Sequence, residues 1–238
     1  MQRLVLASGS PRRKELLARI GIPFDVLVSE IDEELGDHSH AGTFALTMSR
    51  DKARHVAEKL ANRQMPKSSH HEGVPADPAG QVAEPVDGYL VLAADTVVAR
   101  NGYILGKPAN REDALRMLRL LSGGWHEVIT GMTLLSTMTG EELTATETTQ
   151  VKFREADEDF LARYVDTPEP YDKAGAYGIQ GYGALLVEQI DGDYHNVMGL
   201  PLQRLSRMLE SMGIEPLTWL RQNERQDEQQ DGQQDKEQ

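Results

Sequence analysis

The sequence predicts an α/β protein in which helices flank a mixed β-sheet. Short apolar runs, of the length of buried strands, alternate along the chain with stretches whose apolar residues recur every three to four positions. Glycine or proline stands at several boundaries between these segments, as expected where strands and helices end. With 238 residues, the chain can form one large domain or two small lobes.

Four elements are expected in the first part of the chain. Residues 3–7 form a short apolar run typical of a buried strand, and 11–20 follow as an amphipathic helix that Gly21 ends. Residues 24–28 have the composition of a second strand. A long helix is expected over 43–63, because its apolar residues repeat at helical spacing.

The middle of the chain predicts a strand, a hairpin and a helix. Residues 90–98 are almost continuously apolar, which indicates a buried strand. The pair Asn101-Gly102 favours a tight turn to a short strand at 104–105. Residues 111–121 have helical periodicity and are followed by Ser122-Gly123-Gly124, which ends the expected helix.

The last part alternates strands and helices again. Strands are expected at 127–136 and 142–153, and the threonines of the second strand predict that it is half exposed. Residues 157–165 are expected to be helical and 184–190 to form a strand. A final helix is expected over 201–212, with its proline in the first turn.

The composition excludes several classes of function. The chain contains no cysteine, which rules out disulfides, thiolate zinc sites and cysteine nucleophiles. Its net charge of -13 argues against a nucleic-acid polymer as the main partner, since duplex binding needs a positive face. The first apolar run is too short for a signal peptide, and the richest later one contains Asp95. We therefore expect a soluble, cytoplasmic protein with no membrane partner.

Two segments differ in composition from the rest. Residues 64–87 are rich in proline, glycine and polar side chains, which predicts a flexible insertion. Residues 222–238 hold six acids and two bases without apolar anchors, which predicts a disordered acidic tail after a single domain over 1–221. The histidines His38, His40, His70 and His71 are interpreted as loop residues rather than metal ligands, because no rigid scaffold would orient them.

A possible phosphate site begins at Ser8. The segment Ser8–Arg13 stands where a strand gives way to a helix, and free N–H groups at a helix N-terminus bind anions. Ser10 can cap this helix, and Pro11 suits its first position. Arg12 and Arg13 oppose the helix macrodipole unless an anion lies beside them. A capped surface helix with solvated arginines remains an equal alternative.

A single carboxylate lies inside the expected buried strand 90–98. Burying the charge of Asp95 there is energetically unfavourable unless the carboxylate is paired, binds a metal or reaches a cleft. It is therefore a candidate general base or a ligand for a hard divalent cation, with a structural ion pair as the alternative. Asp32 and Glu33 offer further acids, although an exposed acidic turn is the simpler interpretation of this segment.

Other segments could contribute cations and an amide. Lys107 lies in a tight turn and is a plausible phosphate contact. The cations of Arg50–Lys52 lie on the long expected helix, where a solvated face is the simpler interpretation. Gln180 lies in a glycine-rich loop and could read the edge of a base, although glycines there could simply serve turns.

Taken together, these segments resemble the Maf family of nucleotide pyrophosphatases. The resemblance covers about residues 1–212 apart from the insertion, and the combination of motifs is highly specific although each alone is weak. The matching motifs are LASGSPRR at 6–13, IDEE at 31–34, SRDKA at 49–53, AADTVV at 93–98, ILGKP at 104–108, LSGGWHEVITG at 121–131, YDKAGAYGIQG at 171–181 and VMGLP at 197–201.

The resemblance implies a two-lobed fold with a central cleft, similar to inosine-triphosphate pyrophosphatases. It implies hydrolysis of dTTP, UTP and modified forms to the monophosphate and pyrophosphate, with Mg²⁺ or Mn²⁺ as cofactor and a homodimer as a possible assembly. The implied proton acceptor is Asp95. The residues implied in substrate choice are Arg12, Thr96 and Gln180; those in phosphate binding are Ser8, Arg13, Lys52 and Lys107; those in metal binding are Glu33 and Asp95.

Two rival functions remain open at this point. One is a pyrophosphatase for purine nucleotides such as 7-methyl-GTP, which a panel of substrates would distinguish. The other is a non-catalytic, nucleotide-responsive regulator of cell division. Pure binding would not require Asp95, so hydrolysis in the presence of a divalent cation separates the regulator from the enzyme.

Overall fold

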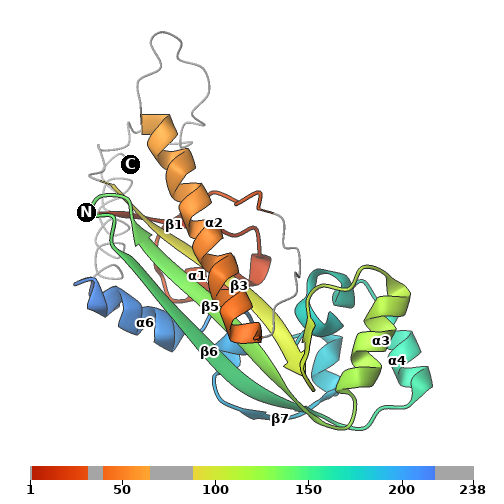
Figure 1. Cartoon of the computed structure of the whole chain (residues 1–238). Coiled ribbons are helices and arrows are strands. Elements are labelled where there is room, and N and C mark those ends of the chain that lie inside the picture. Colours follow the sequence, from red (N-terminus) through yellow and green to blue (C-terminus); the bar gives the residue numbers. More distant parts are fainter. Residues whose placement is uncertain (1, 32–39, 65–87, 218–238) are drawn as a thin grey trace, which may run out of the picture.

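The computed structural model describes residues 2–31, 40–64 and 88–217. In these residues, seven strands form one sheet in the order β2-β1-β3-β5-β6-β7, and β4 pairs with β3 beside this path (Figure 1). The strands are β1 (Arg3–Leu6), β2 (Phe24–Val26), β3 (Tyr89–Arg100), β4 (Tyr103–Leu105), β5 (Trp125–Ser136), β6 (Glu142–Phe153) and β7 (Val187–Asp191). Strand β1 is parallel to β2 and β3, whereas the other pairs are antiparallel. The predicted mixed sheet is confirmed.

Helices occupy most of the segments where the sequence predicts them. The α-helices are α1 (Pro11–Arg19), α2 (Ala41–Gln64), α3 (Arg111–Leu121), α4 (Glu158–Val165), α5 (Tyr194–Val197) and α6 (Leu202–Ser211). Short 3₁₀ helices are η1 (Glu169–Asp172), η2 (Ala174–Ala176) and η3 (Tyr182–Leu185). The expected insertion and tail lie outside the described residues, except that Gln64 is still the last residue of α2.

Three local expectations are wrong. The strand expected over 184–190 begins only at Val187, because the N–H groups of Ala184 and Leu186 bond to the carbonyls of Gly181 and Gly183 in and next to the 3₁₀ helix η3. Ser10 occupies the N-cap of α1, but its side chain makes no capping hydrogen bond. Pro201 is the N-cap of α6 and not a residue of its first turn.

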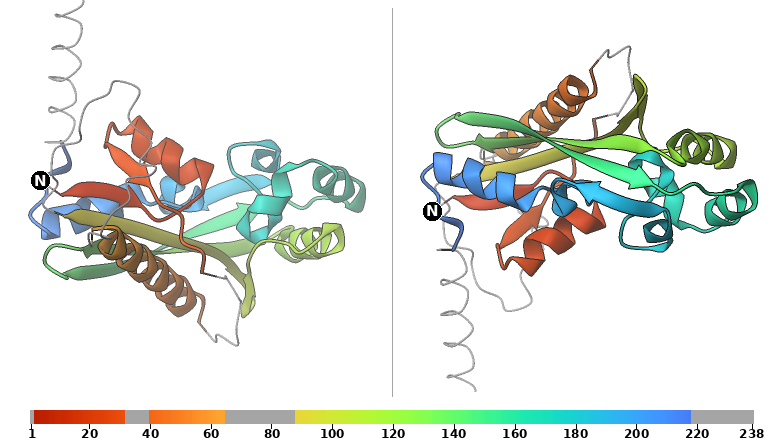
Figure 2. Two further views of the ribbon diagram at one scale, coloured as in Figure 1. Left: turned by 90° about the horizontal axis from the view of Figure 1, so that it is seen from above. Right: turned by 90° about the horizontal axis from the view of Figure 1, so that it is seen from below.

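The sheet lies between helices on its two faces (Figure 2). Alternate residues of β3 point to opposite faces: Leu90 and Leu92 join a core that includes residues of α1 and α6, whereas Val91 and Ala93 join a core that includes residues of α2. No helix in the described ranges is long and apolar enough to cross a membrane.

A second lobe is built at one end of the sheet. Helices α3 and α4 pack there around a separate core, to which the long strands β3, β5 and β6 contribute Val98, Val128 and Phe153 (Figure 1). The turn between β3 and β4 has the expected hairpin geometry, with positive φ at Asn101 and Gly102. The long strands therefore connect the two lobes.

An interruption in strand pairing lies between the lobes. Strand β1 pairs with β3 only as far as Leu92, and β4 begins to pair with β3 at Val98. On this side of β3, no strand in the described part of the chain pairs with residues 93–97. The interruption lies at the carboxyl end of β1, and ligands of open α/β sheets bind outside the carboxyl ends of strands.

Candidate active site

A cavity of about 760 Å³ opens at the interruption in strand pairing. It brings together segments that are far apart in the sequence: the loop after β1, α2, β3, the turn after β4, and the segment from η1 to Gly181. The expected site residues that line it are Ser8, Arg12, Arg13, Lys52, Asp95, Thr96, Lys107 and Gln180. Glu33 and Asp32 lie outside the described residues.

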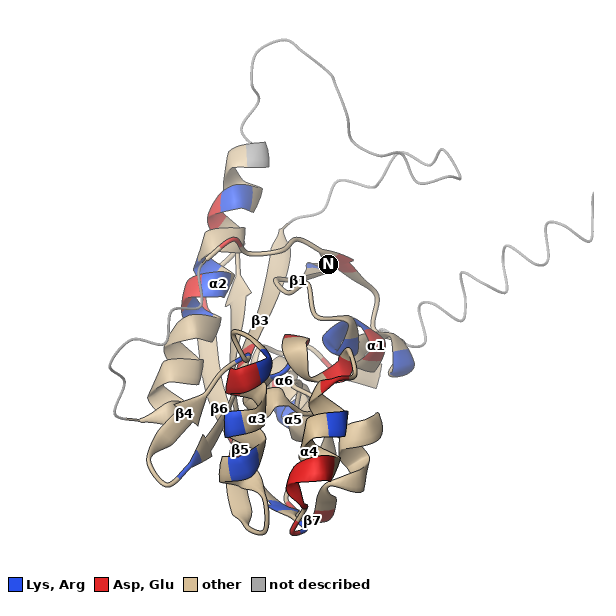
Figure 3. Cartoon of the chain, turned by 90° about the vertical axis from the view of Figure 1, so that its right-hand side faces the viewer, with Lys and Arg blue, Asp and Glu red and all other residues tan. Residues whose placement is uncertain are grey.

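At the floor of the cavity, Asp95 forms an ion pair with Lys52. The Lys52 ammonium donates a hydrogen bond to Asp95 Oδ1 across 2.5 Å, and each residue is only 6% exposed. Charged residues elsewhere lie mainly on helices and loops, while the central strands are largely uncharged (Figure 3). A buried carboxylate in this sheet is therefore held by a specific partner that also faces the cleft.

The interpretation of Lys52 as part of a solvated helix face is wrong. Lys52 lies on the buried stripe of α2, four residues from Met48 and four from Val56, both of which are buried. This i, i+4 spacing is the signal in the sequence that places Lys52 toward the sheet. Arg50, on the neighbouring face, pairs instead with Glu142 and is partly exposed.

Close packing between α2 and β5 brings Lys52 within reach of Asp95. Gly131 of β5 is paired with Asp95 and, like it, faces α2. A Cβ atom at Gly131 would overlap the backbone of α2 at Ala45 and Leu46. Glycine at this position therefore sets the distance between the helix and the sheet.

Arg13 connects α1 to three other segments of the site. Its guanidinium donates to Ser8 Oγ at 3.1 Å, to Thr96 Oγ1 at 3.0 Å and to the Gly199 carbonyl at 2.8 Å. Gly199 has φ of 102°, a conformation that favours glycine. The interpretation of this arginine as merely solvated is wrong. Thr96 also shares a 2.9 Å hydrogen bond with Thr130 of β5.

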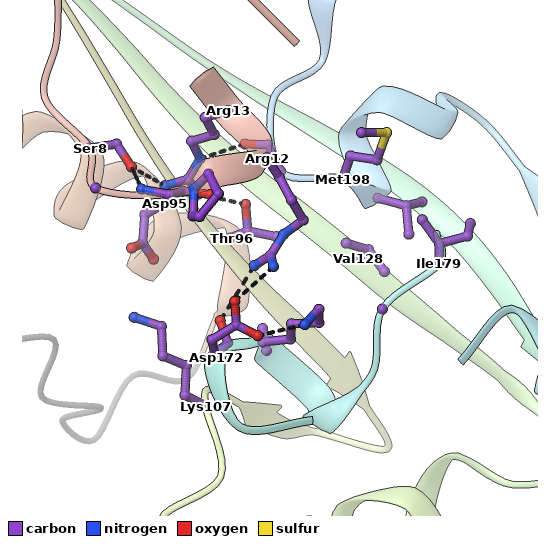
Figure 4. A pocket seen from close by; sticks show the side chains of 18 of the residues that line it. Ser8, Arg12, Arg13, Asp95, Thr96, Lys107, Val128, Asp172, Ile179 and Met198 are labelled. Carbon is purple, nitrogen blue, oxygen red and sulfur yellow. Dashed lines mark hydrogen bonds and ion pairs between the residues drawn. The ribbon is translucent and has the colours of Figure 1, made fainter. Parts of the chain in front are cut away.

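Arg12 reaches across the cleft to the other lobe. Its guanidinium donates to the Asp172 carboxylate at 2.9 Å, and Lys173 donates to the other oxygen of the same carboxylate at 2.5 Å (Figure 4). Burial raises the pKa of Asp172, but the hydrogen bonds from Lys173 and Arg12 outweigh burial and hold the pKa below its usual value. Asp172 had no role in the sequence interpretation, although it lies in the quoted loop motif.

Lys107 and Gln180 are exposed residues on two different loops that line the cavity. The backbone before Lys107 is anchored, because the Gly106 carbonyl accepts a 3.0 Å hydrogen bond from the N–H of Gly175. The side chain of Gln180 makes no hydrogen bond to any of the described residues. A ligand in the cavity is therefore a possible partner for its amide.

An apolar wall was not predicted from the sequence. Val128, Ile179 and Met198 line the cavity on the side away from Asp95 and Lys107 (Figure 4). The buried ring of Tyr177 also lines the cavity, and its hydroxyl is 2.9 Å from His126 Nε2. One end of the site is therefore charged and the other is apolar.

His126 is buried and is not a ligand on the cavity surface. It packs edge-on against Phe153 and Tyr177, with ring centroids 4.8 and 5.4 Å away. Burial, assisted by the nearby charge of Arg100, lowers the pKa of His126 to about 3. The imidazole is therefore neutral and serves to position Tyr177.

The chain is similar to known proteins over most of its length. The family model described as "Maf-like protein" matches residues 3–212. The chain belongs to the Maf family. A relative from Acetivibrio thermocellus, named dTTP/UTP pyrophosphatase, is 46% identical over 217 residues, which cover 91% of this chain and 98% of the relative. A relative of the same name from Exiguobacterium sibiricum is 47% identical over 90% of this chain and 94% of its own length.

A solved structure similar to this Maf-family chain is a nucleoside-triphosphatase / dITP/XTP pyrophosphatase from Mycobacterium abscessus, with 12% sequence identity and a TM-score of 0.34. The match covers 64% of this chain and 74% of the other.

Proposed function

We propose that this protein is a nucleoside triphosphate pyrophosphatase that converts dTTP and UTP in the cytoplasm to the monophosphate and pyrophosphate. The observation that carries the proposal is the buried Asp95–Lys52 pair at the floor of a cavity with one charged and one apolar end. Relatives that share 46% and 47% of their residues with this chain, over about nine-tenths of it, are named dTTP/UTP pyrophosphatases.

The charged end suits a triphosphate. Arg12, Arg13, Lys52 and Lys107 come from three different parts of the chain and line the same cavity. Guanidinium and ammonium groups stabilise the charge that develops on phosphate oxygens and on a leaving pyrophosphate. The N-terminus of α1 adds backbone N–H groups that favour an anion.

The apolar end suits the base and sugar. Val128, Ile179 and Met198 offer a surface against which a flat ring can pack. Gln180 lies on the adjoining loop, and its amide carries both a donor and an acceptor for the edge of a base. A nucleotide bound in this direction places its phosphates toward Asp95.

Asp95 is assigned the role of general base. Lys52 holds Oδ1, while the other carboxylate oxygen makes no hydrogen bond with the described residues. That oxygen accepts a proton from water as the water oxygen bonds to the α-phosphorus. The bond from the α-phosphorus to the bridging oxygen breaks, and this oxygen leaves with pyrophosphate.

The donor chemistry also fits a divalent cation. Mg²⁺ typically binds one or two carboxylates together with substrate phosphates and retains several waters. Asp95 provides one carboxylate at the cavity, and Glu33, outside the described residues, is the second proposed ligand. When bound, Mg²⁺ or Mn²⁺ would neutralise phosphate charge.

The proposal is tested with the purified protein and a panel of nucleotides. We expect pyrophosphate and monophosphate from dTTP and UTP with Mg²⁺ or Mn²⁺, and much slower release from dGTP, ITP and 7-methyl-GTP. Faster release from the purine nucleotides would favour the purine-directed alternative. Tight binding without release would favour the regulatory alternative, and orthophosphate as the first product would contradict cleavage between the α and β phosphates.

A further inference from the structure

The loop that carries Gln180 is fastened to the side chain of Glu169. The Glu169 carboxylate accepts hydrogen bonds from the N–H groups of Tyr182 at 2.7 Å and Gly183 at 2.8 Å. It also accepts a 2.9 Å hydrogen bond from the Tyr164 hydroxyl, which in turn accepts one from the N–H of Gly178 at 3.3 Å. The backbone is therefore held on both sides of Gln180.

The glycines of this loop allow the backbone to approach Glu169 closely. A Cβ atom at Gly181 would overlap Glu169 Oε2, and one at Gly178 would lie 2.7 Å from Lys173 Cε. A Cβ at Gly183 would lie 2.5 Å from the Gly178 carbonyl oxygen and 2.9 Å from the Tyr164 hydroxyl oxygen. These glycines permit close packing of the loop against itself, Lys173, Tyr164 and the Glu169 carboxylate, rather than merely allowing turns.

The position of the Gln180 amide depends on this fastening. Gln180 is exposed, and its side chain has no hydrogen bond to another described residue that would orient it. Only its backbone fixes where the amide enters the cavity. A base-reading group must be held within about half an ångström of its productive position to discriminate between ligands.

We propose that Glu169 is a positioning residue for base selection, acting through the backbone of the Gln180 loop. This proposal rests on the proposed nucleotide pyrophosphatase function and assigns to Glu169 a part of its specificity. Lys173 supports the same residue, because its ammonium donates to the Glu169 carbonyl at 2.6 Å. Glu169 thus binds the Tyr164 side chain of α4 and the backbone after Gln180 directly, and it is linked through Tyr164 to the backbone before Gln180.

The main test is Glu169→Gln, which keeps the size of the side chain but replaces one acceptor oxygen with a donor. At least one of the three hydrogen bonds to the carboxylate is then lost. We expect the ratio of kcat/KM for dTTP over dGTP to fall about tenfold, with a larger change in KM than in kcat. Tyr164→Phe removes one donor and leaves the carboxylate, so it should lower the ratio less.

A double-mutant cycle separates positioning from a general loss of stability. In a Gln180→Ala background, Glu169→Gln should change the ratio less than about twofold, because the group it positions is already gone. Equal falls in the two backgrounds would overturn the proposal. Asp159→Asn is the matched control, since it removes a carboxylate from an exposed ion pair on α4 and should leave the ratio unchanged.

Hydrogen exchange provides a readout that does not depend on activity. The amides of Tyr182 and Gly183 should exchange faster in Glu169→Gln, while the amides of β5 stay protected. Unchanged exchange at both amides would overturn the proposal. If the wild-type protein releases pyrophosphate from none of the nucleotides, both the proposed function and the role of Glu169 are contradicted. If the wild type discriminates and Glu169→Gln keeps the ratio, only the role of Glu169 fails.

Discussion

Lys52 and Asp95 approach each other from different layers of the fold, the ammonium from α2 and the carboxylate from β3, and meet at 2.5 Å. Both are almost fully buried, yet both line the cavity. The pair therefore joins a structural contact between helix and sheet to the proposed chemistry. We therefore expect substitutions of either residue to change both the free energy of unfolding and the rate of turnover, and the two changes can be measured separately.

The first prediction separates these two effects. Asp95→Asn should lower turnover by orders of magnitude, because the general base is lost, and should destabilise the fold by about 3–5 kcal/mol, because the buried ion pair with Lys52 is broken. Lys52→Met should destabilise by a similar amount for the reciprocal reason. Pyrophosphate release and urea unfolding measure the two effects.

The double variant Lys52→Met/Asp95→Asn completes the cycle. Its loss of stability should be smaller than the sum of the single losses, while its activity stays at the level of Asp95→Asn. Additive losses of stability would show that Lys52 and Asp95 do not stabilise the fold through their contact. Near-normal pyrophosphate release by Asp95→Asn would contradict its role as the base.

The second prediction concerns the distance between α2 and the sheet. Gly131→Ala should destabilise the fold by about 1–3 kcal/mol and reduce kcat, because its methyl group would displace the helix that carries Lys52. Gly42→Ala on the same helix is the control: a Cβ there meets nothing within 4 Å and should leave turnover unchanged. Equal activity of the two variants would show that α2 can shift without affecting the site.

The third prediction concerns the competition between Asp172 and phosphate for Arg12. Asp172→Asn should tighten binding of pyrophosphate about two- to fivefold, because the partly exposed pair with Arg12 must break before Arg12 binds a phosphate. Calorimetry at low ionic strength measures the affinity. Asp166→Asn breaks a comparable pair with Arg111 and should not alter it. Weaker binding by Asp172→Asn would indicate that Asp172 orients Arg12 instead.

The fourth prediction is a dependence of stability on pH. The pKa of His126 is about 3 in the folded protein and 6.5 without the surrounding fold, so between these values only the unfolded chain binds the proton. Stability should therefore fall as the pH is lowered from about 6 toward 3, with a contribution of about 1 kcal/mol per pH unit.

His126→Gln removes this titration and can still bond to the Tyr177 hydroxyl. The free energy of unfolding of this variant should depend less steeply on pH than that of the wild type over the same interval. Identical slopes would contradict a buried neutral imidazole. Unfolding in denaturant at several pH values provides the comparison.

Local patterns predicted most elements because the residues that determine them are neighbours in the chain. The helix 111–121 and the strand 142–153 have the expected bounds. The strand expected from 184 begins only at Val187, because the N–H groups of Ala184 and Leu186 bond to the nearby carbonyls of Gly181 and Gly183. The 3₁₀ helix η3 that contains Ala184 begins where the distant Glu169 carboxylate accepts hydrogen bonds from the N–H groups of Tyr182 and Gly183, and no local pattern records that contact.

The sequence by itself determined the α/β class and the unusual chemistry of Asp95 and of the arginines after Ser8, since these follow from periodicity and from charges in unfavourable places. Only the tertiary structure decided that Lys52 is the partner of Asp95, that Asp172 holds Arg12, and that an apolar wall faces the charges. The physical reason is distance along the chain. Such contacts depend on which strands pair and how closely α2 packs, and these relationships are set by the whole core.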